Sequence, residues 1–131
     1  MAVDRDEIAI RAAAVLTTSF VASSIVALRD IGYREIDYLV KVDAAGTLGS
    51  VEAVVQYSLQ SNPSVWINLS TEAVTAGVST LTTYTITAAS PTTGDLIGFT
   101  VPTRGQFQRL MIRGTGTVTA SSVSAYALRR G

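Results

Sequence analysis

Apolar and polar residues alternate with a period of two along much of the chain, which is the pattern of strands with one buried face. Residues 33–42 are the clearest case, with Ile36, Tyr38, Val40 and Val42 on one face. The stretches that read as strands are 8–16, 23–28, 33–42, 50–60, 65–69, 81–88, 96–101, 107–114 and a last one after residue 117. These nine stretches predict a fold of about eight strands.

Glycine- and proline-containing stretches separate these strands and predict tight connections. The sequence DAAGTLG at 43–49 joins 33–42 to 50–60, which predicts an antiparallel pair. The mixed pattern and central glycine of 71–80 predict a loop that crosses one end of the fold. The sequence GTG at 114–116 predicts the turn of a final hairpin.

The N-terminal part carries signals for two structures. Asp4 and Glu7 have the spacing of a helix capping box. Ile8 and Ile10, in contrast, begin an alternating pattern that favours a strand. We expect two strands in this part of the chain, with a short helix or an extended arm within residues 1–10.

Short strands joined by turns at this spacing predict an all-β fold of two antiparallel sheets packed face to face. With about eight strands, a jelly roll is the favoured topology. The length of 131 residues and the uniform composition predict a single β-sandwich domain over residues 1–131.

The sequence contains no cysteine and no histidine. This absence removes disulfides, thiolate zinc sites and every Ser–His or Cys–His catalytic arrangement. Carboxylate chemistry and metal sites built from oxygen ligands remain open, but no residue pattern points to either. We therefore predict a protein that is not an enzyme, with no catalytic residues, cofactor or metal.

Charge and hydropathy argue against a nucleic acid or a membrane as the partner. The formal net charge is zero and the isoelectric point is about 6.2, values that argue against a protein built to coat nucleic acid. Residues 8–28 have membrane-spanning length, but Arg11 and several hydroxyl residues interrupt them and an acidic segment precedes them. We expect a soluble protein without a membrane or export segment.

Two motifs with possible chemistry favour ordinary structural roles. The sequence GTGTVT at 114–119 lacks the third glycine of a dinucleotide fingerprint and the lysine of a P-loop. Strand-like residues follow it, where a phosphate site would need a helix N-terminus. Glu35 and Asp37 share one strand face and could serve acid–base work or bind calcium, but exposed strands carry such pairs routinely.

Two sets of residues are candidates for binding a partner. Trp66 is out of phase with Val65 and Ile67, so it either stacks on a ligand or caps an end of the sandwich. No acidic residue follows Asp95, whereas five arginines do, and these are candidates for an acidic partner surface as well as ordinary strand-edge charge. The five are Arg104, Arg109, Arg113, Arg129 and Arg130.

Several predicted strands present small and hydroxyl residues with few charges. Residues 81–88 carry no charge at all. Such edges expose a free monomer to edge-to-edge pairing, whereas neighbours cover them inside an assembly. The pattern therefore favours a structural or interaction role over that of a solitary enzyme.

The order of these pieces resembles that of small structural proteins of tailed bacteriophages. The resemblance lies in SSIVALRDIGYREIDYLVKVDAAGTLGSVEAVVQYSLQSNPSVWINLS, over 23–70, and in the closing FQRLMIRGTGTVTASSVSAYALRRG, over 107–131. It covers about residues 20–131 and rests on pattern and composition, without a catalytic signature. It implies a β-sandwich, often a jelly roll, and it carries over no catalytic residues.

This resemblance implies a capsid decoration or cement protein, which sits on the shell as a dimer or trimer and joins neighbouring major capsid protein subunits. The expected location is then the capsid surface of a virion assembled in the host cytoplasm, with no direct contact to nucleic acid or membrane. A head–tail, tail or fibre component is the first alternative. A glycan-binding β-sandwich is the second.

Overall fold

The computed structural model describes residues 5–28 and 34–130, and within them the chain is built from β-strands without helices. Its strands are β1 (Arg5–Val15), β2 (Val21–Ala22), β3 (Val26–Ala27), β4 (Glu35–Ala44), β5 (Leu48–Ser58), β6 (Ile67–Asn68), β7 (Ser70–Thr75), β8 (Val78–Thr83), β9 (Thr85–Ala89), β10 (Leu96–Pro102), β11 (Phe107–Gly116) and β12 (Ser122–Arg130). The predicted all-β class is confirmed. In the described part of the chain no helix is present that could span a membrane.

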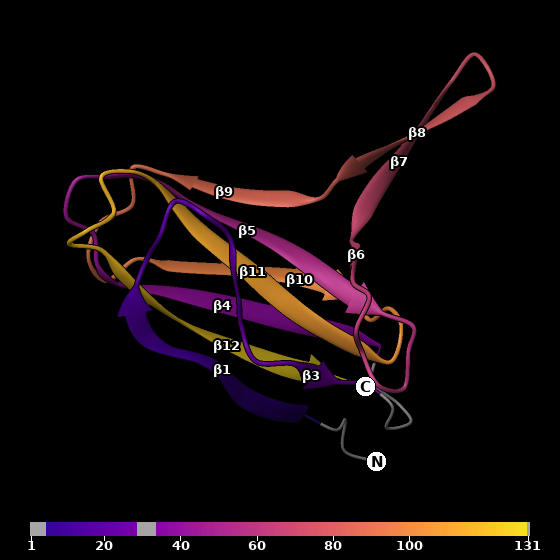
Figure 1. The fold of residues 1–131 in the computed structure, drawn as a ribbon, viewed down its shortest axis with the longest axis horizontal. Coiled ribbons are helices and arrows are strands. Elements are labelled where there is room, and N and C mark those ends of the chain that lie inside the picture. Colours follow the sequence, from indigo (N-terminus) through magenta and orange to yellow (C-terminus); the bar gives the residue numbers. More distant parts are fainter. Residues whose placement is uncertain (1–4, 29–33, 131) are drawn as a thin grey trace.

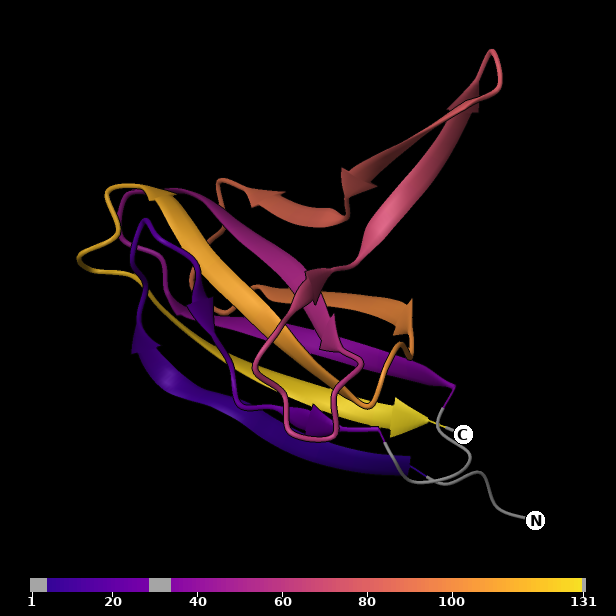
Figure 2. The same cartoon turned by 45° about the vertical axis from the view of Figure 1, so that its right-hand side comes forward.

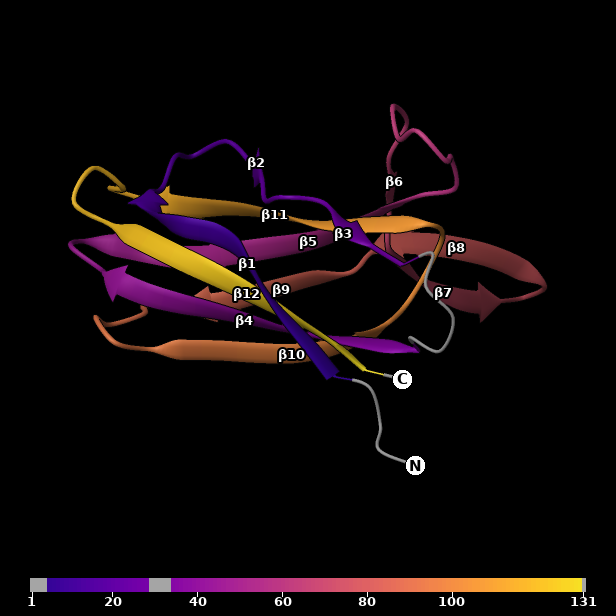
Figure 3. The ribbon, with the colours of Figure 1, turned by 90° about the horizontal axis from the view of Figure 1, so that it is seen from below.

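The strands form two antiparallel sheets and one separate hairpin (Figure 1). Sheet A has the order β1-β12-β4-β10. Sheet B is centred on β11 and β5, with β2 and β3 along the outer side of β11 and with β6 and β9 along the outer side of β5. Seen from below, the strands of sheet A and sheet B lie in two layers (Figure 3).

The topology is that of a jelly roll. When β2 with β3, and β6 with β9, are each counted as one interrupted edge strand, each sheet has four strands. The chain then passes from one sheet to the other at every step except the one from β5 to its neighbours β6 and β9. Two four-stranded sheets connected in this way form the double Greek key of a jelly roll, as the strand pattern predicted.

The core lies between the two sheets and takes its side chains from the apolar faces that the alternation identified. Tyr38 and Ile36 on β4 are 1% and 0% exposed, and Leu110 on β11 is 0% exposed. The large side chains that are almost fully buried are Ile10, Leu16, Val26, Ile36, Tyr38, Val40, Val42, Val51, Val55, Leu110 and Ile112. Tyr57 on β5 is half-buried.

Two predicted hairpins are wrong for the same reason. β4 and β5 lie in different sheets, and so do β11 and β12, so the turns at 43–49 and after 114 carry the chain between sheets. Gly114 and Gly116 belong to the end of β11. The turn itself follows, where the Ser121 amide donates to the Val118 carbonyl at 3.0 Å.

The N-terminal segment is neither a helix nor an arm over its described part. Residues 5–10 belong to β1, which pairs with β12 from Arg5 opposite Arg130 onwards. Burial of Ile10 in the core outweighs the capping-box signal of Asp4 and Glu7, because local helix signals are weak preferences that tertiary packing overrides. Residues 1–4 of the predicted arm lie outside the described residues.

Candidate interaction surface

The β7–β8 hairpin is the feature of the molecule that stands outside the sandwich (Figures 1 and 2). It corrects the prediction of a loop crossing one end of the fold at 71–80. Its two strands are fully paired with each other, from Ser70 opposite Thr83 to Thr75 opposite Val78. Every residue from Thr71 to Thr83 is exposed.

The hairpin is inserted into the outer strand beside β5. Before the insertion, the Leu69 amide donates to the Val55 carbonyl at 2.8 Å, and after it Thr85 lies opposite Val54. The Tyr84 amide donates to the Leu69 carbonyl at 2.8 Å, which closes the base of the hairpin. The insertion therefore leaves the sheet and returns to it at almost the same point.

The tip of the hairpin is a two-residue turn. Ala76 and Gly77 have φ angles of 51° and 76°, and two positive values are the mark of a type I′ turn. This turn matches the natural twist of paired strands, which explains why the chain reverses here. The signal was present in the sequence, because Gly77 sits between two β-branched stretches.

Apart from Glu72, the side chains of the hairpin are apolar or hydroxylic on both faces. Opposed residues of an antiparallel pair share a face, so Glu72, Val74 and Leu81 lie on one side. Val74 and Leu81 are 66% and 69% exposed. Glu72 is the only charged residue between 70 and 83, and its Oε1 accepts from the Ser79 hydroxyl at 2.8 Å.

The five arginines predicted to contact a partner are spread over different faces of the sandwich. Arg109 and Arg113 both lie on the outer face of sheet B, on β11. Arg104 is exposed in the β10–β11 connection beside the base of the hairpin. Arg129 and Arg130 are neighbours on β12, so their side chains leave opposite sides of sheet A.

Four of these arginines are used within the fold. Arg113 Nη2 lies 3.2 Å from Glu52 Oε1. Arg129 is 9% exposed, and its Nη1 donates to the Ala27 carbonyl at 2.7 Å. Arg109 and Arg130 contact other side chains, as described next. These contacts account for the arginines as structural residues, and their role toward a partner stays a prediction.

Trp66 lies against an arginine on the outer face of sheet B. The Arg109 guanidinium sits 4.2 Å from the centre of the Trp66 ring, and its Nε donates to Gln56 Oε1 at 2.9 Å. Partial burial lowers the pKa of Arg109. One face of the indole is therefore covered by a cation, an arrangement that fixes both side chains.

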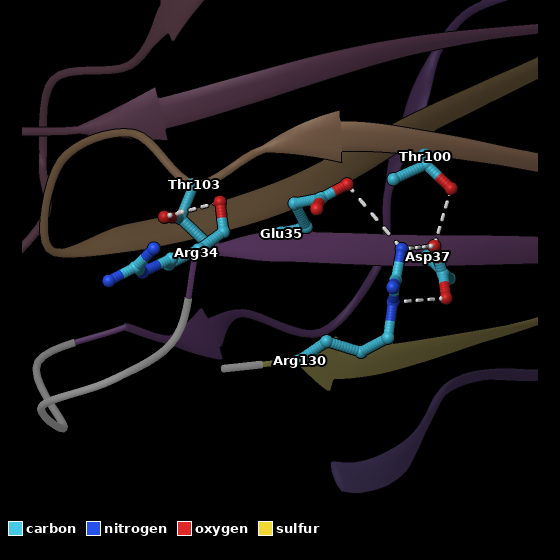
Figure 4. A network of polar contacts seen from close by, with 6 residues as sticks. All are labelled: Arg34, Glu35, Asp37, Thr100, Thr103 and Arg130. Carbon is cyan, nitrogen blue, oxygen red and sulfur yellow. Dashed lines mark hydrogen bonds and ion pairs between the residues drawn. The ribbon is translucent and has the colours of Figure 1, made fainter. Parts of the chain in front are cut away.

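Glu35 and Asp37 face the end of β12, where Arg130 lies between them (Figure 4). Arg130 Nε lies 2.8 Å from Asp37 Oδ2, and its Nη2 lies 3.4 Å from Glu35 Oε2. Thr100 also donates to Asp37. The hydrogen bond that Arg130 donates to the Asp37 carboxylate raises the pKa of Arg130. Both carboxylates thus have a structural partner, which agrees with the expectation of an ordinary strand-face pair.

A shallow hollow of about 710 Å³ lies on the outer face of sheet A. Leu39, Tyr126 and Leu128 line it, together with Gly98 of β10, which lies opposite Leu39 of β4. The Asp37–Arg130 pair lies at its edge. Within the described residues, no three side chains of the metal-binding types are gathered in one place.

Comparison with known proteins gives little further information. No family model matches the chain, and no curated protein matches it. Among solved structures it is similar to one described by the words "Bacillus endospore appendages form a novel family of disulfide-linked pili". The alignment covers 98% of this chain and 85% of that chain, with 22% sequence identity and a TM-score of 0.47. Similarity at this level assigns neither a fold nor a function to the chain.

Proposed function

We propose that this chain is a non-catalytic structural protein that works as one of many copies in an ordered protein assembly. The observation that carries the proposal is the β7–β8 hairpin, which stands outside the sandwich with both faces exposed. An isolated two-stranded hairpin is only marginally stable in water, and exposed uncharged strands invite pairing. A neighbouring protein molecule is the natural partner for such an element.

The assembly we propose is the shell of a tailed bacteriophage, with the chain as a decoration protein on its outer surface. The resemblance of 20–131 to small phage structural proteins supports this choice, as does the jelly-roll topology. Each copy would bind the major capsid protein and span a joint between subunits. The area buried at that joint would then oppose expansion of the shell under the pressure of the packaged genome.

Two other roles differ from this one in copy number and in the surface they need. A head–tail, tail or fibre component would use the same fold at a much lower copy number. A glycan-binding module would need an open aromatic platform, whereas Arg109 covers one face of Trp66 at 4.2 Å. We therefore propose no glycan-binding function.

Copy number in purified particles tests the proposal. We expect quantitative mass spectrometry of the source particles to give this chain in hundreds of copies, in a fixed ratio to the major capsid protein. Adding the purified chain to shells that lack it should raise their disruption temperature. A few copies per particle would assign the chain to the tail or its connector, and absence from all particles would overturn the proposal.

A further inference from the structure

We propose that the free edge of β8 pairs antiparallel with the same edge of a second copy, forming a symmetric dimer through the hairpin. The inference rests on the proposed structural role and specifies its first contact. The resulting four-stranded sheet would have the order β7-β8-β8-β7 across a twofold axis. Such an isologous contact uses the same surface patch on both molecules.

The backbone pattern shows which groups are available for this pairing. In a hairpin with a two-residue loop, the residues that flank the loop exchange both backbone hydrogen bonds, and every second pair repeats this. Thr75 and Val78 are the flanking pair, so Ala73 and Thr80 form the next hydrogen-bonded pair. The amide and carbonyl groups of Ser79 and Leu81 therefore point away from β7, toward the free edge.

The chemistry of the hairpin excludes the other common partners. A nucleic acid needs cationic side chains, and residues 70–83 contain none. A membrane surface needs aromatic or basic residues at the insertion point, and the tip consists of Thr75, Ala76, Gly77 and Val78. A protein strand with uncharged side chains is the partner that remains.

The β8 edge is also the edge that tolerates a copy of itself. β7 carries Glu72 near its middle, so pairing β7 with its copy would bring like charges together. β8 carries no charge and no proline, the features that natural edge strands use to prevent pairing. In the register with Leu81 opposite Leu81 of the second copy, two exposed side chains would cover each other and Ser79 would face Thr83.

Disulfide trapping tests the register, because the chain has no cysteine of its own. Directly opposed residues of the hydrogen-bonded class lie about 5.5 Å apart, within disulfide reach. We expect Leu81→Cys to form a covalent dimer about ten times faster than Val74→Cys, its control on the same face with nearly equal exposure. The two Val74 positions would be separated by three strand spacings, roughly 14 Å, and by four residues along the strands, so they would lie roughly 20 Å apart. Equal rates would overturn the proposal.

Proline substitution tests the edge in solution without a disulfide. Leu81→Pro removes an outward amide from β8, whereas Val74→Pro does the same on β7, and neither touches the β7–β8 ladder. Sedimentation equilibrium should give twice the 13.8 kDa chain mass for the wild type and for Val74→Pro, and the monomer mass for Leu81→Pro. Circular dichroism should confirm that both variants keep the sandwich.

The outcomes separate this inference from the proposed function. A wild-type chain that stays monomeric at millimolar concentration would overturn the dimer, while the copy number in particles would still decide the structural role. The dimer would also be overturned if the wild type were monomeric and bound shells, as Val74→Pro did, while Leu81→Pro did not bind. That result would show that the β8 edge pairs with the shell protein.

Discussion

At the scale of single residues, buried polar groups and crowded turns decide how the sandwich tolerates change. Tyr38 is almost fully buried, and its hydroxyl donates to Gln108 Oε1 at 3.1 Å. Gln108 Nε2 in turn donates to the Pro102 carbonyl at 3.1 Å. If a substitution left any one of these three groups without its hydrogen-bond partner, the free energy of unfolding would fall by about 1–3 kcal/mol.

The alkaline stability of the protein should depend on Tyr38. Burial raises the pKa of its hydroxyl well above the usual value. The unfolded chain releases this proton near pH 10 and the folded protein retains it, so stability is complete below about pH 10 and falls above it by about 1.4 kcal/mol per pH unit. Urea unfolding between pH 8 and pH 11 measures this. The slope should be smaller in Tyr38→Phe, and identical slopes would contradict the prediction.

Among the glycines of the sandwich, Gly105 should be the one whose replacement lowers stability most. Its φ is +68°, and a Cβ there would lie 2.4 Å from the Ser58 carbonyl oxygen. Strain and overlap together predict that Gly105→Ala lowers the free energy of unfolding by about 2–4 kcal/mol. Gly94→Ala is the control, because φ is +92° there but no atom lies within 4 Å. Equal losses in urea unfolding would show that backbone strain alone matters.

At the scale of elements, the protein separates into a sandwich with long paired strands and a hairpin with little support of its own. Consecutive long strands such as β4 and β5 carry the turn signals of a hairpin but lie in different sheets. The hairpin that does form, β7–β8, follows a weaker signal. Local turn chemistry fixes where the chain reverses, and packing decides which strand it then pairs with.

Excision of the hairpin should leave the sandwich folded. Replacing 70–83 by Asn-Gly creates a two-residue turn that keeps the 2.8 Å bond from Tyr84 to the Leu69 carbonyl. We expect the shortened protein to keep the β-sheet spectrum of the wild type in circular dichroism. Its free energy of unfolding should lie within about 1 kcal/mol of the wild-type value. Leu69→Ala, at a position 9% exposed, is the control that should cost about 2 kcal/mol or more. Loss of the fold on excision would show that the hairpin supports the sandwich.

At the scale of the whole molecule, strands from the two ends of the chain are neighbours in sheet A. β12 lies between β1 and β4, and Arg5 pairs opposite Arg130. The sandwich therefore cannot close until the last strand is in place. Pairing of such distant segments is typical of slow-folding β-sandwiches.

A circular permutant tests this arrangement. Joining Gly131 to Met1 leaves five residues between Arg130 and Arg5, enough for a hairpin connection, and new ends can be placed between Ala76 and Gly77. We expect the permutant to fold with an unfolding free energy within about 2 kcal/mol of the wild type, as measured by urea denaturation. New ends within β12, between Ala125 and Tyr126, should abolish folding. A permutant with ends at the tip that fails to fold would contradict the observed topology.

The sequence by itself determined the all-β class, the apolar faces and the jelly-roll count of strands, because alternation of side chains is a local property of each strand. It also placed Glu35 and Asp37 on one exposed strand face. Only the tertiary structure decided that successive strands lie in different sheets, that the five arginines are distributed over several faces, and that 70–83 leaves the sandwich as a hairpin. The sheet assignment and the placement of the arginines depend on contacts between residues far apart in the chain, and the exit of the hairpin depends on which segments pair with β5. No local pattern encodes these contacts.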